Sequence, residues 1–221
     1  MVKIKINKIE RSNRKTIALL INADSTLTVK APLLVSSSYI EELVNKKHNW
    51  ITKKVKDIQA RPKPVTREYV NGEGFLYLGK SYRLKITNCS SIQLGEYLFF
   101  PKQKAEQIQQ ELIDWYKKQA LRKLTSRASW YSKKMGVNFS SLKLSNAEKR
   151  WGSCGRSNTL SFNWRLIMAP LKILDYVVVH ELTHIEEKNH SRKFWNRVKV
   201  VLSDYKKSRS WLKENSQSLI I

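Results

Sequence analysis

The sequence predicts an α+β fold, with a small amino-terminal strand-and-helix unit at residues 1–101 and a second domain at residues 102–221. Three observations lead to this prediction. Short strand patterns and one helical pattern fill the first hundred residues. A long amphipathic segment then begins near residue 104, and a second, more apolar helical segment follows Pro170. With 221 residues, 41% of them hydrophobic, the chain can bury a substantial core.

The first unit opens with a predicted β-hairpin, because β-branched and apolar residues in TIALLINADSTLTVKAP surround the turn-forming NADS. A helix is predicted over residues 38–58, since Ser38 and Glu41 have the spacing of a capping box and apolar residues then recur at helical spacing. This helix must end before Pro62. Proline and glycine in RPKPVTREYVNGEGF indicate a connection, after which FLYLGKSYRLKI and SIQLGEYLFF are predicted to be short strands.

The second unit begins with a predicted amphipathic helix over residues 104–135, and Gly136 is well placed to end it. VNFSSLKLS, which follows, is predicted to be a strand. In TLSFNWRL, residues 159–166, apolar side chains alternate with polar ones, which include Ser161, Asn163 and Arg165. One face of this strand is therefore predicted to be core and the other polar.

Three of the four histidines lie within HELTHIEEKNH, residues 180–190. Apolar residues at spacings of three and four from Pro170 onward predict that a largely buried helix carries the first of them. On this helix His180 and His184 project from nearly the same face, one turn apart, as two imidazoles must to share one zinc ion. Glu181 lies about 100 degrees round the helix, close enough to a metal-bound water to act as its general base.

A zinc ion that keeps one position open for water needs a third protein ligand, and His190 is the candidate. In an unbroken helix His190 would lie roughly 9 Å further along the axis than His184, so the helix must end and the chain turn back near Lys188 and Asn189. Asn tolerates the left-handed conformation that such a turn often uses. Acidic alternatives for the third ligand are Glu186, Glu187, Asp204 and Glu214.

Four short motifs fall within residues 148–195: RWGSC at 150–154, NW at 163–164, HExxH at 180–184, and a histidine followed shortly by FW. In this arrangement the chain resembles the YgjP-type minimal zinc metallopeptidases, distant kin of the SprT-like and WLM proteases. The histidine spacing also equals that of the metzincins. However, Glu187 stands where the metzincins usually have glycine, and no Met-turn is evident.

The resemblance implies a zincin-like metallopeptidase domain at residues 102–221, built around an active-site helix. It also implies zinc on His180, His184 and His190, with Glu181 as the catalytic base that helps water to hydrolyse a peptide bond. Tyr176, Tyr205 and Arg192 remain open as residues that could stabilise the oxyanion, since spacing does not select among them.

The substrate is expected to be an extended peptide or an unfolded protein. Zincins commonly bind a peptide as an added strand, and the strand at residues 159–166 directly precedes the active-site helix. Ser161, Asn163 and Arg165 are therefore candidate substrate-binding residues. The alternative is that this strand is interior and paired on both sides.

The RWGSC motif has two interpretations. Arg150 and its neighbours could border the active site, but a Trp-Gly pair also fits a tight turn with a packed indole. Cys154 could bind zinc in a latent state, or it could be a small buried hydrophobic residue.

The formal net charge of +24 supports a rival hypothesis, a module that binds DNA or RNA through its phosphates and in which proteolysis is DNA-linked, secondary or lost. The charge is spread evenly along the sequence, so a lysine-rich solvated surface explains it equally well. Two cysteines, no long apolar run and no signal-peptide pattern at the amino terminus favour a cytoplasmic protein without a membrane-spanning segment.

Overall fold

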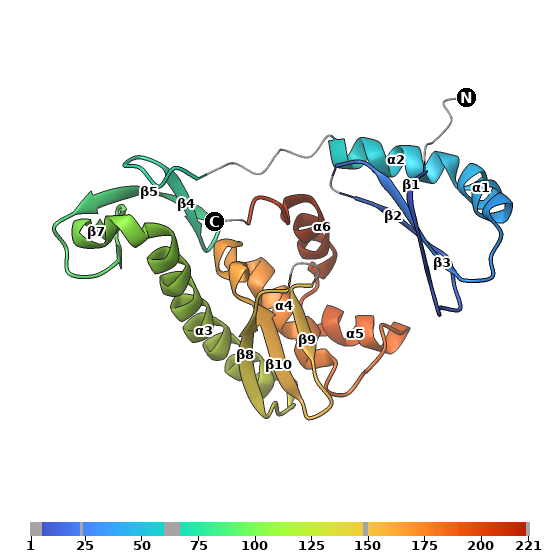
Figure 1. Ribbon diagram of the computed structural model, residues 1–221. Coiled ribbons are helices and arrows are strands. Elements are labelled where there is room, and N and C mark those ends of the chain that lie inside the picture. The colour runs from blue at the N-terminus through green and yellow to red at the C-terminus, as the bar shows by residue number, and fades with distance from the viewer. Residues whose placement is uncertain (1–5, 23, 60–66, 148–149, 220–221) are drawn as a thin grey trace. The chain divides into compact units, whose positions relative to one another are not determined.

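The computed structural model describes residues 6–22, 24–59, 67–147 and 150–219. It confirms the α+β class, with small sheets and long helices in two compact units, Met1–Val65 and Thr66–Ile221 (Figure 1). The units therefore divide earlier than the expected boundary between residues 101 and 102. Part of the predicted connection, residues 60–66, lies outside the described residues. None of the helices in the described ranges has the length and apolar composition needed to span a membrane.

The first unit contains a three-stranded sheet in the order β1-β3-β2, formed by β1 (Ile6–Ser12), β2 (Ala18–Ile21) and β3 (Leu27–Pro32). Strands β2 and β3 are antiparallel and form the predicted hairpin. Asp24 accepts hydrogen bonds from the amide and the hydroxyl of Thr26 in the turn, as turn-forming Asp residues do. Strand β1, which runs parallel to β3, was not expected from the sequence.

Two helices, α1 (Ser37–Lys46) and α2 (His48–Gln59), occupy the region where one was predicted. They meet at Lys47, whose backbone leaves the helical conformation at φ −96° and ψ 11°. The N-cap of α1 is Ser36 rather than Ser38, because the Ser36 hydroxyl accepts the amide of Tyr39. The core of this unit joins the sheet to both helices through Leu27, Val29, Ala31, Ile40, Val44 and Ile51.

The second unit starts with a four-stranded sheet in the order β4-β5-β7-β6. Its strands are β4 (Gly74–Tyr77), β5 (Lys80–Thr87), β6 (Gln93–Leu94) and β7 (Leu98–Pro101). A two-residue turn links β4 to β5, in which Leu78 and Gly79 both have positive φ, at 47° and 80°. Positive φ at both positions suits the right-handed twist of a tight hairpin.

Contacts of this hairpin explain why residues 74–101 belong to the second unit. The amides of Leu78 and Gly79 donate to the carbonyls of Ile167 and Met168, at 2.7 and 3.0 Å. A Cβ on Gly79 would lie 2.9 Å from the Cα of Pro170, so only glycine allows this approach. The hairpin thus packs on the segment that leads into the histidine-bearing helix.

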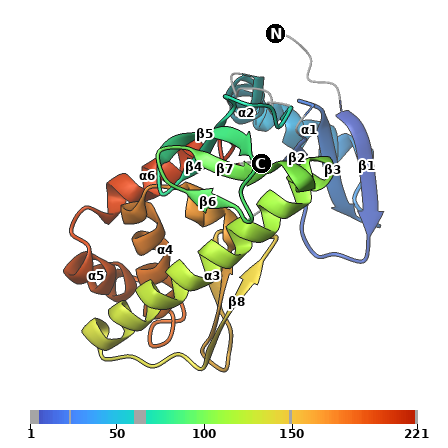
Figure 2. The same cartoon turned by 90° about the vertical axis from the view of Figure 1, so that its left-hand side faces the viewer.

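A long helix, α3 (Ile108–Met135), follows the short 3-10 helix η1 (Lys102–Gln107) and runs along the second unit from the four-stranded sheet (Figure 2). The predicted helix is confirmed, and Gly136 ends it in the left-handed conformation, at φ 68°. The second sheet has the order β8-β10-β9, from β8 (Ser141–Ser145), β9 (Gly152–Cys154) and β10 (Thr159–Asn163).

The remaining elements are the 3-10 helix η2 (Trp164–Met168) and three helices, α4 (Leu171–Thr183), α5 (Arg192–Val201) and α6 (Tyr205–Asn215). Helix α4 is the centre of the unit, since it contacts α3, α5, α6, η2 and β9. An ion pair between Arg127 on α3 and Asp175 on α4, with N–O distances of 2.6 and 2.7 Å, fixes the two helices to each other. The large apolar core around α4 therefore gives the histidines a rigid support.

Candidate metal centre

Helix α4 presents the first two histidines from a buried segment. Val177, Val178 and Leu182 are at most 4% exposed and hold the helix in the core. His180 and His184 are only partly buried, so one short stretch of the helix reaches the surface. The helix ends at Thr183, and His184 is already its C-cap.

Helix α4 ends earlier than the turn expected near Lys188 and Asn189. Asn189 is not among the residues with positive φ, so the chain reverses without the expected left-handed residue. Instead, a series of turn hydrogen bonds closes on the end of α4, including the Glu187 amide to the Thr183 carbonyl at 3.0 Å. This early turn places His190 beside α4.

The three histidines converge on one point. The Nε2 atoms of His180 and His190 are 2.9 Å apart, and the ring centroids of the three imidazoles are 4.7 to 5.0 Å apart. One ligand atom from each side chain lies within 4.8 Å of the others. Nitrogen atoms bound tetrahedrally to one zinc ion at about 2.0–2.1 Å would be separated by a little over 3 Å, so this cluster fits a shared metal ion.

Hydrogen bonding orients His184 as a ligand. Its Nδ1 lies 3.0 Å from the backbone carbonyl of Glu187, which can only accept a hydrogen bond, so the proton is on Nδ1 and the Nε2 lone pair is free. His180 Nδ1 is buried and has no hydrogen-bond partner among the described residues.

The acidic alternatives for the third ligand do not join the cluster, which is the one such group of metal-binding side chains in the described part of the chain. Glu186 forms an ion pair with Arg197, and Glu187 contacts His184 through its backbone carbonyl. Glu214 accepts a hydrogen bond from Ser210, and Asp204 is at the N-cap position of α6.

Burial favours the neutral form of His180 and His184, which is the form that binds a metal. It lowers the pKa of His180 to about 3, with smaller contributions from His184, His190 and Arg209. Burial also lowers the pKa of His184.

Aromatic side chains surround the cluster. The Phe194 ring lies 4.6 to 4.9 Å from all three imidazoles, and the Trp195 indole stacks on His190 at 5.6 Å. Both come from the first turns of α5, which begins at an N-cap, Ser191, directly after His190. The FW pair of the sequence motif therefore forms one wall of the metal centre.

Glu181 is buried, at 5% exposure, beside strand β9. Burial raises the pKa of its carboxyl to about 8, and the positive charge of Arg150 opposes this rise. A Cβ on Gly152 would lie 2.6 to 2.9 Å from three side-chain atoms of Glu181, so the carboxylate packs directly on the glycine backbone. Gly152 of the RWGSC motif thus lies against Glu181, while Trp151 packs on the apolar core, so the motif has features of both interpretations.

The NW motif holds this glycine strand in place. The Asn163 side chain donates to the Ala147 carbonyl at 2.9 Å, and the Trp164 indole donates to the Asn146 side chain at 2.7 Å. The Asn163 amide donates to the Trp151 carbonyl at 2.8 Å. Asn163 thus ties β10 to the residue before Gly152, and the side chains of Asn163 and Trp164 hold residues 146 and 147, roles that the sequence pattern did not predict.

The strand β10 is not the edge strand that was expected to bind a peptide. It pairs with β8 on one side and β9 on the other, so its main chain is already hydrogen-bonded in both directions. Ser161 is opposite both Lys143 and Ser153, Asn163 is buried, and Arg165 lies over the Trp164 ring on η2. This corrects the basis on which these three residues were proposed to bind substrate.

Cys154 is separate from the histidine cluster among the described residues. Its half-buried thiol has a raised pKa because of burial, and its sulfur lies 3.7 Å from the Gly155 carbonyl. Cys154 is therefore a partly buried residue that packs against the apolar core. Of the candidates for an oxyanion partner, Tyr176 makes an edge contact with His180 at 5.9 Å, and Tyr205 is stacked against Trp195.

The chain was compared with known proteins. A solved structure, the metallopeptidase zymogen of Methanocaldococcus jannaschii jannalysin, is similar at 24% sequence identity and a TM-score of 0.37, over 44% of this chain and 97% of that one. A search of curated proteins found no match. The sequence profile of the YgjP-like metallopeptidase domain matches residues 15–215, which is most of the chain. The protein therefore belongs to the YgjP-like metallopeptidase domain family.

Proposed function

We propose that the protein is a zinc-dependent peptidase with His180, His184 and His190 as the metal ligands. The convergence of three imidazoles within 4.8 Å carries this proposal. Three neutral nitrogen ligands that leave a fourth position open are typical of catalytic zinc, whereas structural zinc is usually enclosed by four ligands rich in cysteine. Membership of a metallopeptidase family supports the reaction class.

Glu181 is the proposed general base. A bound zinc ion would acidify a coordinated water and polarise the peptide carbonyl. Glu181 follows His180 directly, and the contact with Gly152 restricts its side chain to one place. From there it takes a proton from the attacking water and returns it to the leaving amine.

Strand β9 is the proposed docking edge for an extended peptide or unfolded protein. In the described part of the chain β9 pairs only with β10, so its other edge can accept an added strand. Because Gly152 on β9 touches Glu181, a peptide on this edge would pass the catalytic base. The edge replaces Ser161, Asn163 and Arg165 as the expected substrate contact.

The test compares Glu181→Gln with the wild-type protein. Protein purified without chelator should contain about one zinc per chain in both, and only the wild type should cleave an unfolded substrate. Glu106→Gln, the same chemical change at an exposed residue of η1, is the control and should remain active. Absence of zinc from the wild type would contradict the metal assignment, and turnover by Glu181→Gln would contradict the assignment of the base.

The net charge of +24 supports a second candidate function, binding of DNA or RNA, either beside proteolysis or in place of it. Such binding should be measurable at low salt and should weaken log-linearly as salt rises, with little preference for sequence. No binding at low salt would remove this candidate. Binding without zinc-dependent cleavage would favour it over the peptidase. For either function, the two free cysteines support a reducing compartment such as the cytoplasm.

A further inference from the structure

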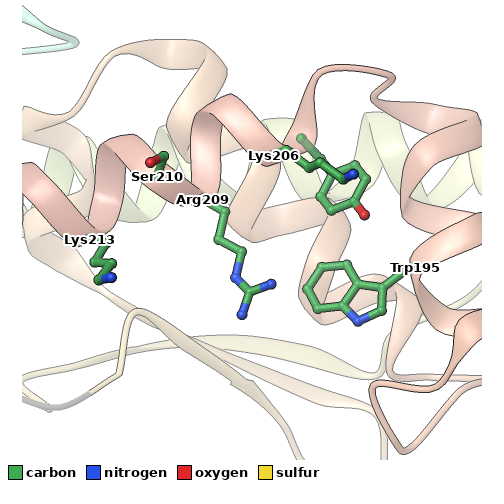
Figure 3. Close-up of a pocket in the computed structure, with 6 residues that line it drawn as sticks. Trp195, Lys206, Arg209, Ser210 and Lys213 are labelled. Atoms are coloured by element: carbon green, nitrogen blue, oxygen red, sulfur yellow. The ribbon is translucent and has the colours of Figure 1, made fainter. Parts of the chain in front are cut away.

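A second feature lies next to the metal centre, a pocket of about 630 Å³ between α5 and α6 (Figure 3). Three of the side chains that line it are cationic, and all three come from α6. The complete lining is Trp195, Tyr205, Lys206, Arg209, Ser210 and Lys213. The proposed catalytic mechanism uses none of these residues.

The cations are gathered on one face of α6. Lys206, Arg209 and Lys213 have spacings of three and four, and Figure 3 shows Arg209 and Lys213 projecting to the same side of the helix. Like charges at these spacings repel each other. None of the three forms an ion pair with a described residue, and Glu214 next to them is hydrogen-bonded to Ser210. A bound anion would relieve this repulsion.

Trp195 connects the pocket with the metal centre. Its indole is stacked on the His190 ring at 5.6 Å and on Tyr205 at 5.2 Å, and the Arg209 guanidinium lies 5.0 Å from its centroid. One side chain therefore separates a metal ligand from the guanidinium. Because an extended peptide advances about 3.3–3.6 Å per residue, a substrate at the metal would reach the pocket within about three residues.

We propose that this pocket binds a carboxylate of the substrate peptide, close to the bond that is cleaved. The inference rests on the proposed peptidase function and specifies its substrate class. The carboxylate belongs either to an Asp or Glu side chain or to a free carboxyl terminus. The Arg209 guanidinium can bind it through two parallel hydrogen bonds, and Lys206 and Lys213 add charge on either side.

A peptide carboxylate suits the pocket better than a nucleic-acid backbone does. The three cations span two turns of one helix, about 11 Å, which matches one or two anionic groups rather than a track of phosphates. Their position beside the histidine cluster, with Trp195 in contact with both His190 and Arg209, also places them within reach of a peptide bound at the metal.

The test measures binding by zinc-loaded Glu181→Gln protein, so that turnover does not interfere. The probes are three fluorescently labelled peptides. Two have amidated carboxyl termini and differ only by a Glu-to-Gln exchange. The third has the sequence of the Gln peptide but a free carboxyl terminus. The Glu peptide or the free-terminus peptide should bind at least about tenfold more tightly than the neutral, amidated one, which corresponds to about 1.4 kcal/mol. Which of the two is preferred identifies the source of the carboxylate.

Because Arg209 remains, Lys206→Gln combined with Lys213→Gln should lower this preference about threefold. Adding Arg209→Gln should reduce it to about one. Lys207→Gln is the matched control, since it removes a lysine from the same helix at an exposed position outside the pocket, and it should keep the preference. Equal affinities for all peptides, including no measurable binding, would overturn the inference, as would an equal loss in the control.

A single-stranded oligonucleotide is the last probe. If it binds more tightly than every peptide, and the lysine substitutions abolish that binding while Lys207→Gln does not, the pocket recognises phosphate and the inference is wrong. Failure of the peptidase proposal would look different, because zinc-dependent cleavage would then be absent while the carboxylate preference in binding remained.

Discussion

Replacing Gly152 with Ala tests whether strand β9 positions the carboxylate of Glu181, the proposed general base. The added Cβ would lie 2.6 Å from Oε1 of Glu181, 2.7 Å from its Cγ and 2.9 Å from its Cδ. These separations are at least about half an ångström shorter than an ordinary contact between nonbonded heavy atoms at about 3.5–4.0 Å. Glu181 is only 5% exposed, so its side chain has little room to move away.

Two effects of different size are expected. Overpacking should lower the free energy of unfolding by about 1–3 kcal/mol. Activity should fall much further, by about a hundredfold, because displacing a catalytic group by about 1 Å can cost that factor. Zinc content should stay near one per chain, since the contacts made by the new Cβ involve Glu181 and no histidine.

The assay combines urea unfolding, metal analysis and cleavage of an unfolded protein at a temperature where both variants are folded. Gly155→Ala is the control, because its Cβ would meet the carbonyl oxygen and the Cβ of Thr159 at ordinary contact distances of 3.5 and 3.9 Å. In a Glu181→Asp background the shorter side chain should reduce the destabilisation caused by Gly152→Ala. Wild-type turnover by Gly152→Ala would refute the reasoning, because it would mean that β9 does not hold the base.

Three further changes test other parts of the unit. His190→Ala should lower zinc affinity by at least about tenfold. The circular dichroism spectrum should stay unchanged, because His190 is exposed in a turn. Full zinc retention would exclude His190 as a ligand. Asp175→Asn should lower the free energy of unfolding by about 2–3 kcal/mol, because it leaves the partly buried Arg127 without its ion partner. Urea unfolding measures this change, and a decrease below about 0.5 kcal/mol would contradict the prediction. Trp164→Phe should cost about 1 kcal/mol of stability by removing the hydrogen bond to Asn146, and an unchanged melting temperature would argue against that bond.

Local spacing was sufficient to predict the parts of the site that share one helix. His180, Glu181 and His184 lie within five residues, so helical geometry alone relates their side chains. His190 was predicted from the requirement for a third ligand, but the path of the chain was not. The early end of α4 at Thr183 depends on turn hydrogen bonds that leave no clear signal in the sequence.

Tertiary contacts explain the predictions that differ from the structure. The alternation in residues 159–166 indicates a strand but not its neighbours, and the position of β10 between β8 and β9 follows from pairings with segments up to 18 residues away. The contact between Gly79 and Pro170 joins residues that are 91 positions apart, so local patterns do not show that residues 74–101 pack with the second unit. Arg209 was missed because α6 approaches Trp195 only in the folded chain.

The RWGSC and NW motifs both help to fix the position of the Glu181 carboxylate. The Asn163 amide donates to the carbonyl of Trp151, the residue before Gly152, and Gly152 packs on Glu181. A general base must be placed to within a fraction of an ångström, and a helix alone leaves its long side chain several rotamers. The backbone of β9 removes that freedom, and only glycine lets it approach so closely. Like β8, β9 is an edge strand of its sheet, but β9 is the one of these two that contacts Glu181, so a peptide added to β9 would be aligned by the same backbone that packs on the proposed base.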